Sequence, residues 1–351
     1  MFCFIVSLII DFILYASKIV LNFYPKVSIL VAARNEEHNI VRCLESLAAL
    51  SYPKKYLQIL IGNDDSNDQT SNLIENYISD KSCFRLINIT SQQNDLKGKA
   101  NVLAQLAQVA TGEYFFFTDA DIQVPANWIE GVLPHFKPNV GIITGITTVE
   151  GRGFLPQFQA IEWLFALSVM RLISLFKMPL TAMGNNMAVS KHAYLAVGGY
   201  AKVGFSVVED FALFGAITEK KFDFVQLFDA EVTTISRPIP TFKDLMVQRK
   251  RWMRGALSLP IGHRIGVFVA GSMLPLLVLL CMWSAKLAFM FSIIYYLALT
   301  TWLIGALNWI GQQKLFFALP LFWFYHLFTN FAMIVNYYST KTTTWKGRQY
   351  D

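Results

Sequence analysis

The sequence predicts an α/β protein, with a mostly parallel sheet covered by helices and transmembrane helices at both ends. Short apolar runs of β-forming residues alternate with helical patterns in the middle of the chain, and strands that are apolar throughout are typical of a buried parallel sheet. Hydrophobic residues make up 54% of the 351 residues and charged ones only 15%. Soluble domains carry roughly 25% charged residues, so part of this surface is expected to face lipid.

The alternating elements follow one another in the order βαβαβαβ. The expected strands are VSILVA (27–32), LQILIG (57–62), FRLINI (84–89) and EYFFFT (113–118), and the expected helices cover about 36–50, 70–78 and 99–110. Ligands of open α/β sheets bind beyond the carboxyl ends of the strands. Functional residues are therefore expected directly after each apolar run.

Apolar segments at the two ends predict membrane helices. Residues 1–25 read as a retained transmembrane helix, because they lack the basic start and the small-x-small site of a cleaved signal peptide. The stretch 265–310 is long enough for two helices that turn near 284–286, and 315–338 is long enough for a third. The remaining divisions are a soluble domain at 26–238, an amphipathic interfacial helix at 239–264, the membrane segment at 265–340 and a basic tail at 341–351.

Charge predicts the side of the membrane. Basic residues beside membrane segments favour the cytosol, so we expect the soluble domain there and the protein in a bacterial inner membrane. Three spans after that domain would put the tail outside, whereas its basic residues favour the inside, so one C-terminal segment is expected to be re-entrant or to lie flat.

Charge and cysteine spacing exclude other classes. The net charge of +6 is modest and gives no nucleic-acid-binding stripe. The four cysteines lie far apart without C-x-x-C spacing, which predicts neither a disulfide framework nor a zinc site.

Three polar loops follow the predicted strands, at 34–37, 63–68 and 119–121. Singly, each has an ordinary explanation: Asn35 would cap the next helix, and 63–68 is rich in turn formers. All three would meet at one edge of the sheet, which is harder to assign to turn chemistry. Asp119 and Asp121 are two residues apart, and paired carboxylates repel unless a cation lies between them. Mg²⁺ or Mn²⁺ is the expected cofactor, bridging carboxylate to phosphate oxygens and neutralising a departing nucleoside diphosphate.

With these residues in hand, the chain resembles the membrane-bound family-2 glycosyltransferases over about 27–255. The loop at 64–70 resembles their D-x-S-x-D-x-T motif, 119–121 their D-x-D motif, Glu209 and Asp210 their later acidic pair, and 248–252 their Q-x-x-R-W motif. The resemblance implies an inverting enzyme with the Rossmann-like GT-A fold. Ala32 stands where many relatives have proline and Asp65 where glycine is common, and both departures fall in or beside loops expected to contact the nucleotide base.

The resemblance also implies roles for individual residues, of which Asp210 would be the base and Glu209 its catalytic neighbour. Metal binding falls on Asp121 and Asp119. Donor contacts are implied for Ala33, Arg34, Glu36, Asp64, Lys99, Asp119 and Arg251, and acceptor contacts for Gly184, Asn185, Gln248 and Trp252.

Two late motifs have physical readings of their own. A carboxylate at Asp210 suits proton removal from an acceptor hydroxyl, although acids also favour the start of a helix such as 211–219. Gln248, Arg251 and Trp252 share one face of a helix at 241–259. The same helix is also expected to lie at the membrane interface, with Trp252 at headgroup level. Arg249, Lys250 and Arg254 are expected to touch anionic lipid. Residues 154–178 are expected to form a second interfacial helix whose apolar face meets either core or membrane.

The acceptor follows from architecture and from the resemblance. The few spans and the tail at 344–350 resemble the group that glycosylates ceramide, hopanoid or carotenoid lipids. The expected partners are a nucleotide-sugar, most commonly of uridine in the family, a membrane lipid acceptor and the bilayer, with no nucleic acid. Two alternatives stay open: a processive synthase of a cell-surface polysaccharide, and an inactive membrane-tethered nucleotide-binding subunit. The second would be expected to have lost carboxylates that this chain retains.

Overall fold

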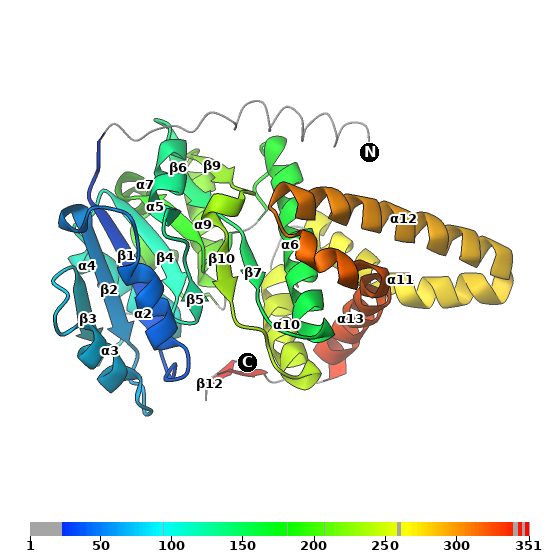
Figure 1. Cartoon of the computed structure of the whole chain (residues 1–351), viewed down its shortest axis with the longest axis horizontal. Coiled ribbons are helices and arrows are strands. Elements are labelled where there is room, and N and C mark those ends of the chain that lie inside the picture. Colours follow the sequence, from blue (N-terminus) through cyan, green and yellow to red (C-terminus); the bar gives the residue numbers. More distant parts are fainter. Residues whose placement is uncertain are drawn as a thin grey trace.

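A seven-stranded sheet forms the centre of the computed structural model (Figure 1). The structure describes residues 23–93, 95–180, 182–206, 208–257, 261–339, 343–345 and 348–350. The strand order is β3-β2-β1-β4-β8-β6-β9, and of these seven strands β8 alone is antiparallel to its neighbours. Their bounds are β1 Val27–Ala33, β2 Leu57–Asn63, β3 Phe84–Asn88, β4 Tyr114–Asp119, β6 Val140–Thr144, β8 Met187–Ser190 and β9 Asp223–Gln226. The predicted mostly parallel α/β sheet is confirmed.

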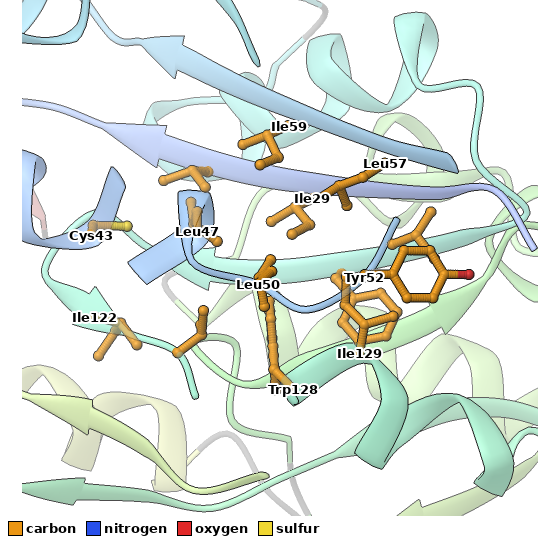
Figure 2. Packing of buried hydrophobic residues seen from close by; sticks show 14 of the residues in the cluster. Ile29, Cys43, Leu47, Leu50, Tyr52, Leu57, Ile59, Ile122, Trp128 and Ile129 are labelled. Atoms are coloured by element: carbon orange, nitrogen blue, oxygen red, sulfur yellow. The ribbon is translucent and has the colours of Figure 1, made fainter. Parts of the chain in front are cut away.

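Helices cover both faces of this sheet. One face packs Ile29 and Phe116 against α2, α3 and α5, and Figure 2 shows Leu47 and Trp128 within that core. The other face packs Leu30 and Phe117 against α4 and α7 to α9. The bounds are α2 Ile40–Ala48, α3 Thr70–Ile78, α4 Gly98–Val109, α5 Trp128–Val132, α7 Lys191–Ala196, α8 Gly199–Val203 and α9 Glu209–Glu219.

A small second sheet lies where the main sheet meets the apolar helices. Its order is β5-β10-β7, with β5 at Ile122–Gln123, β10 at Thr234–Ser236 and β7 at Thr147–Val149. Strand β10 is antiparallel to β5 and parallel to β7, so it ties the chain after Asp121 to the chain that enters α10.

Five longer helices follow or flank this sheet: α6 Phe154–Leu175, α10 Phe242–Leu257, α11 Ile261–Trp283, α12 Ala285–Trp309 and α13 Leu319–Ser339. A third core joins Leu164 of α6 to Leu303 of α12 and Phe322 of α13. Helices α11 and α12 form a hairpin that projects away from the sheet (Figure 1), and the predicted turn falls at Ser284, whose Oγ accepts a hydrogen bond from the Leu287 N–H. Within the described residues, α6, α11, α12 and α13 are long and apolar enough to cross a membrane.

Two sequence predictions need separate mention. The helix expected at 36–50 is shorter, because Glu36 and Glu37 belong to a turn whose N–H groups are bonded to the next loop. The predicted membrane helix at 1–25 lies almost entirely outside the described residues. In the tail, β11 (Thr343–Trp345) and β12 (Arg348–Tyr350) pair as a hairpin, and β11 lies against α10.

Candidate active site

The loops after β1 and β2 are joined by hydrogen bonds from each backbone to the other's side chains. The N–H of Asn35 donates to Ser66 Oγ (3.1 Å), and the N–H of Asn67 donates back to Asn35 Oδ1 (3.0 Å). The N–H of Glu36 donates to Thr70 Oγ1 at 2.7 Å. The side chain of Asn35 therefore bridges two loops rather than capping α2, whose N-cap residue makes no side-chain capping bond.

The same pair of loops carries the predicted nucleotide contacts. Arg34 Nη1 donates to the carbonyl of Asp64, while Asp64 and Glu36 are themselves buried. Asn35 and Asp65 both have positive φ, at 51° and 53°, a region that Asn and Asp tolerate better than most residues. The sequence grouped Arg34, Glu36 and Asp64 at one edge, and the structure brings them together there.

Lys99 joins two acidic residues from different elements. It lies in the first turn of α4, and its Nζ is 2.6 Å from Asp119 Oδ1 at the end of β4 and 2.9 Å from Glu209 Oε1 at the start of α9. Burial opposes the charge on Lys99, but the carboxylates of Asp119, Glu209 and Asp210 outweigh it, and the pKa of Lys99 is raised well above its ordinary value. The ammonium group reduces the repulsion among these carboxylates.

Asp121 lies near Cys43 of α2, as Asp119 does. Burial raises the pKa of the Cys43 thiol well above its ordinary value, and the charges of Asp121 and Asp119 raise it further, so both carboxylates lie near the same point of α2. Among the described residues, no group of three or more His, Cys, Asp or Glu side chains is arranged to hold a metal ion. Two carboxylates completed by diphosphate oxygens fit Mg²⁺ or Mn²⁺, whose ligands are hard oxygens.

Asp210 is held by two backbone groups. Its Oδ2 accepts the Gly184 N–H at 2.7 Å, and its Oδ1 accepts the Phe211 N–H at 2.8 Å. Burial and the neighbouring Glu209 carboxylate raise the pKa of Asp210 to about 6, against the lowering effect of Lys99 and of these two hydrogen bonds. A carboxylate with this pKa is ionised at neutral pH and is a stronger base than an ordinary aspartate.

The two asparagines after Gly184 join the main sheet to its neighbours. Asn185 accepts the hydroxyl of Thr118 on its carbonyl and that of Thr147 on its Oδ1, so it joins the end of β4 to β7. Asn186, which the resemblance placed in the same Gly-Asn-Asn run but gave no role of its own, accepts Trp128 Nε1–H and donates to the carbonyls of Ile146 and Val232. Its place in a Gly-Asn-Asn run was the available signal. The acceptor role of Asn185 stays a prediction.

The Q-x-x-R-W residues lie on α10 as predicted, yet one expectation for this helix is wrong. Arg249 and Lys250 are 2% and 4% exposed, so neither can touch lipid headgroups. Arg249 instead forms two hydrogen bonds with the carboxylate of Glu162 on α6, at 2.9 and 3.1 Å. The side chain of Arg254 lies outside the described residues.

Sequence similarity assigns the chain to a family. The sequence model for glycosyl transferase family 21 matches residues 3–351. The chain belongs to this family. The motifs had pointed to family 2, because they report on the chemistry of donor and base rather than on family boundaries, while the lipid-glycosylating group that we specified fits family 21 and its relatives.

Two curated relatives of this family-21 chain have different products in their names. A beta-monoglucosyldiacylglycerol synthase of Trichormus variabilis is 28% identical over 241 residues, which are 66% of this chain and 49% of the relative. A poly-beta-1,6-N-acetyl-D-glucosamine synthase of Staphylococcus epidermidis is 23% identical over 325 residues, covering 89% of this chain and 73% of the relative. The chain thus spans about half the length of the first relative.

A solved structure supports the fold. A mannosyltransferase from Pyrobaculum calidifontis, in complex with GDP-Man and Mn²⁺, superposes with a TM-score of 0.54 at 16% identity, covering 91% of this chain and 96% of that one. The GT-A class expected from the sequence is thereby confirmed.

Proposed function

We propose that this family-21 chain is an inverting glycosyltransferase that moves a sugar from a nucleotide-sugar to a lipid in the membrane. The observation that carries the proposal is the cluster of Asp119, Lys99, Glu209 and Asp210, in which a carboxylate with a pKa of about 6 lies beside the ion pairs of Lys99 at the carboxyl edge of the sheet. The Asp210 carboxylate can act as the base on one side of the sugar, and positive charge near Asp119 can stabilise the leaving diphosphate on the other.

The chemistry assigns one role to each part. Asp210 Oδ takes the proton of the acceptor hydroxyl while that oxygen bonds to the anomeric carbon, and the bond from this carbon to the diphosphate breaks. The electron pair leaves with the nucleoside diphosphate. Lys99 keeps Asp119 and Glu209 from repelling the donor, and the joined loops after β1 and β2 seat the nucleotide. Asp119 and Asp121 would hold Mg²⁺ or Mn²⁺, which, when bound, supplies positive charge to the diphosphate.

A lipid acceptor is supported by the apolar hairpin and by the diacylglycerol product named for the Trichormus relative. In the apolar stretch of each helix, only 6% of α11 and 17% of α12 is buried within the protein, against 33% of α6 and of α13. Helix α12 has 25 residues, about 37 Å of helix, enough to cross a hydrocarbon layer of roughly 30 Å. At the hairpin tip, Met282 and Trp283 are 80% and 88% exposed. The hairpin is thus the part best suited to insertion.

The tail supports one topology. Because β11 lies against α10, the tail and the Q-x-x-R-W helix share one side of the membrane. Helix α13 packs mainly on α11 and also on α10, α12 and α6. Two crossings by α11 and α12 would return the chain to that side, so a tail on that side requires that α13 adds no third crossing. This arrangement accounts for a basic tail beside a domain that uses cytosolic nucleotide-sugars.

A polysaccharide acceptor is the second candidate, favoured by the match of 89% of this chain to the Staphylococcus synthase. Product size separates the two. Purified protein in nanodiscs that contain diacylglycerol is incubated with Mn²⁺ and with radiolabelled UDP-glucose or UDP-N-acetylglucosamine, and the label is measured in the organic and aqueous phases. Small, organic-soluble product is expected, and label in a large aqueous polymer would instead establish the second candidate.

Variants of two acids tie the activity to the site. Asp210→Asn is expected to abolish transfer and to keep donor binding, whereas Asp80→Asn, at a side chain 78% exposed, serves as the matched control. Equal activity of Asp210→Asn and the parent would remove Asp210 from the mechanism.

A further inference from the structure

Helix α10 is joined to α6 by an ion pair, and the carboxylate of that pair is hydrogen-bonded to α13. Arg249 donates from Nε and Nη2 to the two carboxylate oxygens of Glu162 on α6, at 3.1 and 2.9 Å. Tyr325 on α13 donates its hydroxyl to Glu162 Oε2 at 3.0 Å. We call these three residues the α10 clamp. They come from parts of the sequence as much as 163 positions apart, so the clamp fixes the relative placement of three helices.

The geometry of the clamp is of the strong kind. A planar guanidinium that meets a carboxylate with two parallel N–H bonds is directional as well as strong, and lysine cannot reproduce it. Arg249 is only 2% exposed, so loss of Glu162 would leave a buried charge without its counter-ion. Because desolvation offsets most of the attraction, such a pair adds little stability, and its main effect here is to fix the orientation of α10 relative to α6.

Two residues of Q-x-x-R-W rest directly on the clamp. The Arg249 guanidinium lies 4.2 Å from the centre of the Trp252 ring, in a cation–π arrangement, and its Nη1 donates to Gln248 Oε1 at 3.0 Å. Trp163, next to Glu162 on α6, packs against the Trp252 ring, and the two ring centroids are 5.2 Å apart. The orientation of Gln248 and Trp252 is therefore set by α6 as much as by α10 itself.

We propose that Glu162, Arg249 and Tyr325 are positioning residues that hold Gln248 and Trp252 in their working orientation, and that couple this acceptor-side pair to the apolar helices. The inference rests on the proposed function in that Gln248 and Trp252 contact the acceptor. A displacement of α6 or α13 is transmitted through Glu162 and Arg249 to the Trp252 ring.

The test separates acceptor from donor kinetics. Full-length Glu162→Gln and Tyr325→Phe are assayed in nanodiscs against the parent, with acceptor and donor varied in turn. The expected result is a loss of kcat/KM for the acceptor of roughly 10- to 100-fold in Glu162→Gln and a smaller loss in Tyr325→Phe, with the donor KM within about twofold. Glu162→Asp, which keeps the charge, is expected to recover part of the loss.

Controls on the same helices and loops exclude a general effect. Tyr338→Phe removes a hydroxyl from an exposed residue of α13, and Lys314→Met breaks the exposed pair of Lys314 with Glu150. Both are expected to match the parent. Trp252→Phe, alone and combined with Glu162→Gln, completes the cycle: if Glu162 acts through Trp252, the two losses are not additive.

Several results would overturn the inference. Among them are additive losses, a rise in the donor KM as large as the fall in acceptor kcat/KM, and parent-like kinetics of both Glu162→Gln and Tyr325→Phe. Should Glu162→Gln fail to bind nucleotide because it is misfolded, Tyr325→Phe, which retains the ion pair, decides alone. A parent protein that transfers no sugar contradicts the proposed function instead, so the two failures are distinguishable.

Discussion

A single methyl group at Gly184 is expected to disable the base. A Cβ added there would lie 2.7 Å from both Cβ and Oδ2 of Asp210 and 3.0 Å from its Cγ. Ordinary contact begins near 3.4 Å, so the carboxylate must retreat by about 0.7 Å in Gly184→Ala. A displacement of this size at a reacting group costs roughly 10- to 100-fold in kcat, or about 1.4 to 2.7 kcal/mol of activation free energy.

The assay is the initial rate of sugar transfer at saturating donor, together with nucleotide binding by calorimetry. Gly215→Ala is the matched control, because Gly215 lies on α9, the helix that carries Asp210, and a Cβ at Gly215 meets no atom within 4 Å. The control is expected to keep its rate and to gain up to about 1 kcal/mol of folding stability from the better helix former. A Gly184→Ala rate within twofold of the parent would refute the positioning of Asp210 by Gly184.

Three further predictions follow from the geometry. Asp210 acts as a base only when ionised and its pKa is about 6, so the transfer rate is expected to fall about tenfold per unit as the pH drops below 6; a flat profile between pH 5 and 8 would contradict this role. Chelation is expected to stop transfer in the parent, with recovery on added Mn²⁺ or Mg²⁺, and Asp121→Ala is expected to raise the metal concentration needed; full activity in chelator removes the metal from the mechanism. Gly62→Ala places a Cβ 2.3 Å from Cγ1 of Val102 and is expected to lower the unfolding free energy by about 1 to 3 kcal/mol, and an unchanged melting temperature would show that α4 can shift freely.

The sequence predicted those elements whose pattern lies within a short stretch of consecutive residues. The strands β1, β2 and β4 are continuous apolar runs, and their ends fall within one or two residues of the expected ones. The second sheet was missed because β5 and β7 have two and three residues, too few for a pattern. The turn at Ser284 between α11 and α12 was predicted because a polar residue and a lysine interrupt an apolar segment.

The site shows the same division. Helical spacing put Gln248 and Trp252 on one face, yet it could not reveal where Arg249 points, because its partner Glu162 is 87 positions earlier in the sequence. A basic cluster beside an apolar segment favours lipid contact by composition alone. The buried counter-ion on α6 reverses that expectation, and only the tertiary arrangement reveals it.

The hydrogen bonds between the loops after β1 and β2 have an evolutionary consequence. Asn35 both receives an N–H from Asn67 and sends its own to Ser66, and Glu37 exchanges bonds in the same way with Asp68 and Gln69. A substitution in one loop therefore removes a hydrogen-bond partner of the other loop, which favours paired changes at these positions. Descendants of this chain that bind a different nucleotide are expected to have changed both loops together, as one inherited unit.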